Sequence, residues 1–150
     1  MSKPVVAAIC YRRNDSKIEF LLVRTKSGKY WTFPKGHVEK EPPEKPWDAA
    51  NREAREEAGA VGVIETGPLT SYAYSKGNAG EEDVVSAYLM SVESQLKPHE
   101  PDRDPQWFTP ERAIKKLASG GRKAKYAREH ERVVREAVTK LGVTARRRQR

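Results

Sequence analysis

The sequence predicts an α/β (α+β) fold in which a mixed β-sheet lies between helices on both of its faces. Short segments rich in β-branched and aromatic residues are spread over the first 108 positions, a composition typical of strands. A strongly helical segment interrupts them at residues 46–58, and helical periodicity returns after residue 109. At 150 residues with 37% apolar side chains, the chain is expected to form a single domain, which we place at residues 1–141.

Two hairpin strands and a short third strand are expected before the first helix. Residues 5–11 and 18–23 are rich in β-branched or aromatic side chains, and the polar segment 13–16 between them favours a turn. The segment 31–34 is a short strand ended by its proline. Gly36 follows in a loop, where its missing side chain opens backbone conformations closed to other residues.

The first helix is the most strongly indicated element. Residues 47–58 are rich in Ala, Glu and Arg, which favour helix. The apolar side chains recur three or four positions apart and so share one face: Trp47, Ala50, Ala54 and Ala58. Pro46 suits the first turn of this helix, and Gly59 suits its C-terminal cap.

The second half of the chain alternates between strands and irregular segments before it becomes helical. Strands are expected at residues 61–64, 69–74, 84–92 and 107–108. The segments 76–83 and 95–106 are expected to be a mobile loop and a proline-rich irregular stretch. Thr109 then caps a helix that ends before Gly120, and a last helix covers residues 125–141 with one apolar and one charged face.

The composition narrows the class of protein. Cys10 is the sole cysteine, so disulfides and zinc knuckles are excluded and a buried structural thiol is expected. The chain has neither an apolar run of the ~20 residues that cross a bilayer nor a secretory signal pattern, so we expect a cytoplasmic protein without membrane contact. Of the net charge of +8, four units lie in Arg146–Arg148 and Arg150. Residues 142–150 are therefore expected to be a flexible, solvated tail, with RNA contact as the less favoured interpretation.

Three carboxylates share one face of the first helix. The spacing of Glu53, Glu56 and Glu57 places them within about 6 Å of one another, where repulsion costs stability unless a cation lies among them. Oxygen ligands without His or Cys predict Mg²⁺, with Mn²⁺ as a substitute, rather than zinc. The alternative is a solvated Glu/Arg surface with weak ion pairs, which the helix charges alone would favour.

The loop before the helix favours the metal site, because residues 36–60 resemble the Nudix box. Its pattern is Gly, five residues, Glu, seven residues, Arg-Glu, an apolar residue, any residue, Glu-Glu, any residue, Gly and an apolar residue. The residues that occupy it in order are Gly36, Glu44, Arg52, Glu53, Ala54, Glu56, Glu57, Gly59 and Ala60. Seven residues rather than five separate Gly36 from Glu44, an insertion around Pro42 and Pro43 that leaves the loop geometry open.

The resemblance spans residues 4 to about 140 and implies a Nudix-type α/β/α sandwich and a metal-dependent phosphoanhydride hydrolase. The implied metal ligands are Glu53, Glu56, Glu57 and the carbonyl of Gly36. Arg52 would position the glutamates and Glu44 would support the loop. The base that accepts a proton from water differs among such enzymes, so Glu56 is the first candidate and Glu82 the second, with a solvated loop as the alternative for residues 81–83.

The Nudix box does not encode the group linked to the nucleoside diphosphate, and the flanking residues give only hints. Arg24, Lys26 and Lys35 are candidates for binding additional phosphates. Tyr74 and its neighbour Tyr72 either stack on a base or belong to the core. The lead-in sequence at 34–37 resembles diadenosine polyphosphate and diphosphoinositol polyphosphate hydrolases.

The expected partner is therefore a phosphorylated small molecule. Alternatives are a hydrolase of damaged nucleoside triphosphates or capped RNA ends, and a non-catalytic nucleotide- or RNA-binding module with a basic tail. The resemblance implies a monomer or a homodimer.

Overall fold

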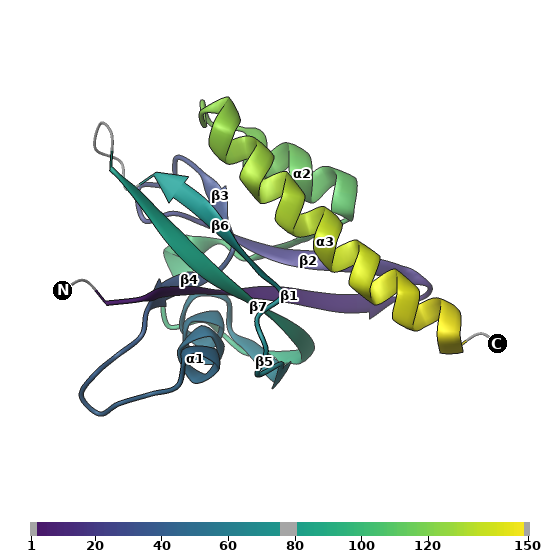
Figure 1. Cartoon of the computed structure of the whole chain (residues 1–150), viewed down its shortest axis with the longest axis horizontal. Helices are drawn as coiled ribbons and strands as arrows, with labels where there is room; N and C mark the ends of the chain where they lie inside the picture. Colours follow the sequence, from purple (N-terminus) through teal and green to yellow (C-terminus); the bar gives the residue numbers. More distant parts are fainter. Residues whose placement is uncertain (1–2, 76–80, 149–150) are drawn as a thin grey trace.

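The computed structural model describes residues 3–75 and 81–148, with side chains for residues 3–75 and 81–142. A mixed sheet runs through this part of the chain, with one helix on one face and two on the other (Figure 1). The helices are α1 (Pro46–Ala58), α2 (Pro110–Ala118) and α3 (Ala124–Arg148), with a 3-10 turn η1 (Pro101–Arg103). The strands are β1 (Val5–Asn14), β2 (Lys17–Arg24), β3 (Trp31–Thr32), β4 (Lys35–His37), β5 (Ala60–Ile64), β6 (Thr70–Ser75), β7 (Glu82–Gln95) and β8 (Gln106–Phe108).

The sheet is built around β1 and β7, which run parallel from the pair Val5↔Val85 to the pair Tyr11↔Ser91. The strand order is β3-β2-β1-β7-β5, with β4 beside β1, β6 beside β7 and β8 beside β2. The first part of β1 pairs antiparallel with β4 and its second part with β2. The expected mixed sheet between helices is confirmed.

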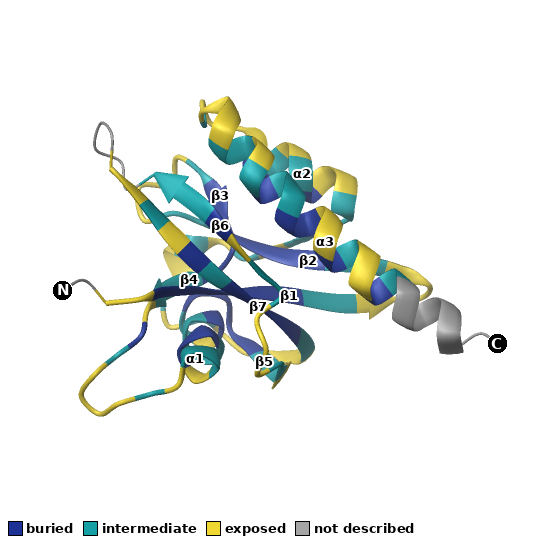
Figure 2. Ribbon diagram, in the orientation of Figure 1, coloured by how far each residue is buried: buried dark blue, intermediate teal, exposed yellow. Residues whose placement is uncertain are grey.

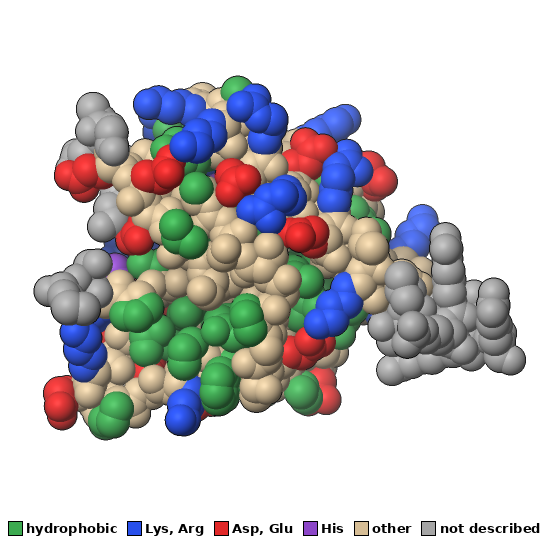
Figure 3. All heavy atoms as spheres, viewed as in Figure 1, with side chains coloured by type: hydrophobic (Ala, Val, Ile, Leu, Met, Phe, Trp, Pro, Cys, Tyr) green, Lys and Arg blue, Asp and Glu red, His purple; other side chains and the backbone are tan. Residues whose placement is uncertain are grey.

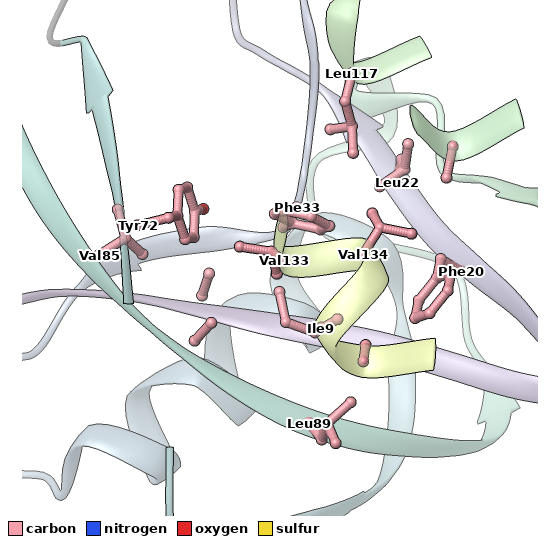
Figure 4. Packing of buried hydrophobic residues seen from close by; sticks show 14 of the residues in the cluster. Ile9, Phe20, Leu22, Phe33, Tyr72, Val85, Leu89, Leu117, Val133 and Val134 are labelled. Carbon is pink, nitrogen blue, oxygen red and sulfur yellow. The ribbon is translucent and has the colours of Figure 1, made fainter. Parts of the chain in front are cut away.

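Alternate residues of β1 face opposite sides of the sheet and contribute to two separate cores. The set on the side of α2 and α3 is Val5, Ala7 and Ile9, and Figure 4 shows Ile9 among its neighbours. The set on the side of α1 is Val6, Ala8 and Cys10. Cys10 is 1% exposed, and burial raises the pKa of its thiol to about 12, which confirms the expected buried thiol.

Helix α1 begins and ends where the sequence predicts. Pro46 is its first residue, and Gly59 follows it with a φ of 68°, a left-handed conformation that favours glycine. Its alanine face is buried against the sheet (Figure 2), with Ala50 and Ala54 at 0% exposure.

Several strand and helix ends differ from the prediction. β1 and β2 extend further than expected, so the hairpin turn is only Asp15-Ser16, and Asp15 adopts a φ of 60°, which Asp tolerates. β7 begins at Glu82 and not at residue 84. Lys76 and residues 77–80 of the expected loop lie outside the described residues. α3 continues to Arg148, past the expected end at residue 141, and the solvated tail stays a prediction because the side chains of 143–150 are not described.

The outer surface of α2 and α3 carries Lys and Arg side chains interleaved with Glu (Figure 3). Arg135 pairs with Glu131 at 2.8 Å, and Arg132 pairs with Glu136 at 2.8 Å. This arrangement is typical of a solvated helix face. None of the described helices has the length and apolar character needed to cross a membrane.

Candidate active site

Arg52 is the centre of the site, because its guanidinium joins the loop before α1 to the carboxylates on α1. Nε and Nη2 donate to the two carboxylate oxygens of Glu44 at 3.1 and 2.7 Å, and Nη2 also donates to the carbonyl of His37 at 3.0 Å. Nη1 donates to Glu53 at 3.2 Å and to Glu56 at 3.3 Å. A planar guanidinium suits this fork of acceptors. Arg52 therefore contacts both the loop and two carboxylates of α1, and its positioning role stays a prediction.

The two-residue insertion leaves the Glu44–Arg52 contact in place. Residues 40–43 close on themselves through a bridge between Lys40 and Pro43, next to a cis peptide bond between Glu41 and Pro42. At the base of this loop, the carboxylate of Glu44 accepts a hydrogen bond from the Glu39 amide at 2.8 Å. The extra residues are therefore accommodated within the loop tip, and Glu44 supports the loop as expected.

Gly36 lies in β4, and the expectation that it adopts an unusual backbone conformation in a loop is wrong. The reason for a glycine here is close approach: a Cβ atom on Gly36 would lie 1.8 Å from Oε2 of Glu53. The neighbouring amide of Lys35 donates to Oε1 of Glu57 at 3.4 Å. The backbone of β4 and the acidic face of α1 are thus in direct contact, as the proposed grouping of Gly36 with the glutamates requires.

Burial disfavours the charged form of the carboxylates on this face of α1. Glu57 is 3% exposed, and burial, reinforced by Glu53, raises its pKa to about 8 although Arg103 and Lys35 oppose the shift. Burial also raises the pKa of Glu53, whose carboxyl group is within hydrogen-bonding reach of that of Glu57. Closely spaced buried carboxylates of this kind favour either a shared proton or an added cation.

Among the described residues, no three His, Cys, Asp or Glu side chains are already gathered into a group that could hold a metal ion. Arginine contacts account for this: Arg52 draws Glu53 and Glu56, and Arg103 lies 3.6 Å from Glu57. The oxygen atoms present nevertheless suit a hard divalent cation, because they belong to the carboxylates of α1 and to the backbone of Gly36. An ion bound here would compete with Arg103 for the carboxylate of Glu57.

Arg103 and Glu100 belong to this site, although sequence reasoning missed both. Nε of Arg103 donates to Glu100 at 2.9 Å, and Nη1 donates to the carbonyl of Arg24 at 3.2 Å. The amide of Glu100 donates to the carbonyl of Glu56 at 3.2 Å, which ties the η1 segment to α1. These residues lie in the proline-rich stretch, where the sequence offers no periodicity that relates them to the helix.

Two clefts meet at the site. The carboxylate cleft, of about 390 Å³, is lined by Val5, Lys26, Lys35, Gly36, His37, Glu39, Glu53, Glu56, Glu57, Tyr74, Glu100 and Arg103. The tyrosine cleft, of about 440 Å³, is lined by Thr25, Tyr30, Thr32, Lys35, Tyr74, Ser75, Gly121, Arg122, Lys123, Tyr126 and His130. Lys35 and Tyr74 belong to both, so the clefts are continuous.

The structure brings some of the candidate substrate residues into the clefts. Lys26 lines the carboxylate cleft, and Lys35 lies 5.1 Å from the ring of Tyr74 between the two clefts. Burial lowers the pKa of Lys35, with Glu57 acting in the opposite direction. Arg24 lines neither cleft: its guanidinium lies over Trp31 at 4.3 Å.

Two further candidates have other surroundings. Tyr72 is a core residue at 1% exposure, packed against Phe33 (Figure 4). Glu82 does not line the carboxylate cleft. Its carboxylate instead accepts hydrogen bonds from Lys125 at 2.6 Å and from Tyr126 at 2.8 Å. His130, on α3, is buried at 2% exposure.

Comparison with known proteins gives a family and several relatives. A family model described as "NUDIX domain" matches residues 1–129. The asymmetrical bis(5'-nucleosyl)-tetraphosphatase of Caenorhabditis elegans is 49% identical over 51 residues, which are 33% of this chain and 36% of the relative. Nudix hydrolase 13, mitochondrial, of Arabidopsis thaliana is 28% identical over 110 residues, which are 67% of this chain and 54% of the relative. The matches thus span about a third and about half of these relatives.

A solved structure covers more of the chain. The crystal structure of a C. elegans Ap4A hydrolase binary complex superposes with a TM-score of 0.70 at 27% sequence identity, over 94% of this chain and 98% of that chain. The arrangement of sheet and helices described above is therefore shared with that enzyme along nearly the whole length of both chains.

Proposed function

Because the chain belongs to the Nudix domain family, we propose that it is a magnesium-dependent hydrolase of a phosphoanhydride bond in a nucleoside diphosphate linked to a second group. We favour diadenosine polyphosphates as the substrate class, in line with the relatives from C. elegans. The observation that carries the proposal is the junction of the two clefts, which share Lys35 and Tyr74. Together they offer room for phosphates beside the glutamates and for a base beside the tyrosines.

The cation would be held by Glu53, Glu56, Glu57 and the carbonyl of Gly36. When bound, Mg²⁺, or Mn²⁺ in its place, supplies positive charge to the phosphates and makes water more acidic. Arg52 would keep Glu53 and Glu56 on the cleft side of α1 through the contacts at 3.2 and 3.3 Å. Lys35 and Lys26 would hold phosphate oxygens, since both line the carboxylate cleft.

We assign the proton transfer from the attacking water to Glu56, which lines the cleft and is less buried than Glu57. Among acids from later segments, Glu100 lines the same cleft, whereas Glu82 is held by Lys125 and Tyr126. Each of these three is compared as the Gln variant. Removal of a general base costs about 10²–10⁴-fold in kcat. The largest kcat loss at saturating Mg²⁺ therefore identifies it, and a greater loss in Glu100→Gln or Glu82→Gln would refute Glu56.

The test of function is nucleotide and phosphate release with Mg²⁺ present, with each product identified. The panel holds diadenosine polyphosphates, diphosphoinositol polyphosphates, nucleoside triphosphates, nucleotide sugars and capped RNA. Glu57→Gln is expected to abolish turnover, whereas Glu93→Gln, at an exposed position on β7 away from the cleft, is expected to retain it. Undiminished turnover in Glu57→Gln would refute the metal assignment.

The same panel separates the alternatives. A preference for nucleoside triphosphates, damaged ones included, or for capped RNA would replace the substrate class and keep the reaction. A nucleotide- or RNA-binding module predicts no Mg²⁺-dependent turnover on any of them. The interleaved charges on α2 and α3 (Figure 3) provide no uniformly positive surface for RNA on that side.

A further inference from the structure

The tyrosine cleft ends on a buried histidine that the proposed reaction does not use. His130 lies on α3, is 2% exposed and lines this cleft. Its ring stacks on Phe33 at 5.7 Å with an interplanar angle of 16°, and it meets the edge of Tyr72 at 5.1 Å. Contacts on two sides fix the orientation of the imidazole ring.

The hydrogen bonds of His130 fix its tautomer. Nδ1 lies 2.7 Å from the carbonyl oxygen of Tyr126. A carbonyl only accepts, so Nδ1 carries the proton and Nε2 of the neutral ring is an acceptor. Burial, together with the nearby charge of Arg122, lowers the pKa of His130 to about 3. The ring therefore stays neutral at physiological pH, and Nε2 remains an acceptor.

Nε2 opens on the cleft. No described residue donates to it, and among the described residues the buried side-chain polar atom without a partner is the hydroxyl of Tyr72. Nε2 is therefore not sealed in the core, and the cleft is the space that His130 lines. A fixed acceptor at the end of a cleft selects a ligand that presents a donor.

The walls of the cleft indicate which part of a ligand reaches His130. Tyr30, Tyr74 and Tyr126 line it. Two cations that also line the cleft lie against these rings, Arg122 at 5.1 Å from Tyr30 and Lys35 at 5.1 Å from Tyr74. Aromatic faces stack flat bases. The described lining contains no carboxylate, so phosphates next to the base meet no negative charge there.

We propose that Nε2 of His130 accepts a hydrogen bond from an N–H group of the substrate's nucleobase, which makes His130 a specificity-determining residue. This rests on the proposed function, because it places the nucleoside of the substrate in the tyrosine cleft and its phosphates toward the glutamates. Bases with an amino group, such as adenine, are then preferred to a purine base without any N–H donor.

The test pairs two ligands with two proteins. Diadenosine tetraphosphate is compared with its analogue in which purine replaces adenine, on the wild type and on His130→Phe, which keeps an aromatic ring against Phe33 and loses Nε2. One hydrogen bond corresponds to a roughly 3- to 10-fold difference. We expect the wild type to show a KM lower by that factor for the adenine substrate at similar kcat, and His130→Phe to treat both alike. Val133→Ala, a core change on the same helix, is expected to keep the preference.

A binding measurement separates this proposal from the proposed function. AMP and purine riboside monophosphate are titrated without metal while the ¹⁵N resonance of His130 Nε2 is followed. We expect AMP to bind more tightly and to move this resonance, and the analogue to leave it unchanged, whether or not any substrate is hydrolysed. Equal affinities with no movement of the resonance, or a preference that persists in His130→Phe, would overturn the role of His130. Correct discrimination without turnover would overturn only the proposed reaction.

Discussion

Replacement of Glu57 by glutamine is expected to stabilise the metal-free protein at neutral pH while it abolishes turnover. Glu57 is 3% exposed, and its pKa is raised from 4.5 to about 8, chiefly by burial. A carboxyl group with a raised pKa binds its proton more tightly in the folded than in the unfolded chain. Its contribution to stability is therefore fully present below pH 4.5 and is lost as the pH rises toward 8.

The magnitude follows from this pKa. Each pH unit between 4.5 and about 8 costs the folded wild type about 1.4 kcal/mol, or roughly 3 kcal/mol by pH 7. Glutamine has nearly the same volume and still offers an oxygen to the Lys35 amide, but it carries no charge. Relative to the wild type, the free energy of unfolding of Glu57→Gln should thus gain ~3 kcal/mol between pH 4.5 and pH 7. Urea unfolding with EDTA, from pH 4.5 to pH 8, measures this difference.

Mg²⁺ provides a second arm of the same experiment. A bound cation adds positive charge beside the ionised carboxylate of Glu57. Mg²⁺ should therefore stabilise the wild type at pH 8 and leave the stability of Glu57→Gln nearly unchanged. The exposed control Glu93→Gln should follow the wild type at every pH. A stability difference between wild type and Glu57→Gln that is independent of pH, or that shrinks as the pH rises, would refute the inference that ionised Glu57 destabilises the fold.

Three further changes test other contacts. Gly36→Ala should lower both stability and turnover, because its Cβ would lie 1.8 Å from Glu53 Oε2, and normal unfolding and kinetics would contradict that close approach. Arg103→Gln should increase Mn²⁺ affinity, measured by electron paramagnetic resonance, since Arg103 lies 3.6 Å from Glu57, and weaker binding would mean that Arg103 orients the ligands. Tyr72→Phe should raise the free energy of unfolding by about 1 kcal/mol in urea, because the buried hydroxyl has no partner, and a loss of stability would reveal a missed hydrogen bond.

The parts of the fold that depend on local spacing were predictable from the sequence. Helix α1 ends at Ala58, just before Gly59, as expected, because glycine favours the left-handed conformation at a C-terminal cap. Thr109 caps α2 by accepting from the amide of Arg112. The predicted strand ends were less accurate. Strand β4 was not predicted, because Gly36 pairs with β1, which lies thirty residues earlier in the sequence.

The candidate site divides in the same way. Helical geometry alone places Glu53, Glu56 and Glu57 on one side of α1. The contact between Glu44 and Arg52 at 2.7 Å was not predicted and comes from the structure. Neither Glu100 nor Arg103 has such a local relation to α1. They reach the carboxylate cleft only because η1 folds back beside it.

The sequence by itself thus determined the fold class and the helix that carries the carboxylates, because neighbours three and four residues apart on a helix are fixed by its geometry. The role of Arg52 was implied by the resemblance to the Nudix box. Only the tertiary structure decided that Glu57 is buried, that Gly36 makes room for Glu53, and that Tyr74 and His130 line one cleft. These properties arise where β4, β6 and α3 pack together, and no local pattern records which distant side chains meet across a sheet.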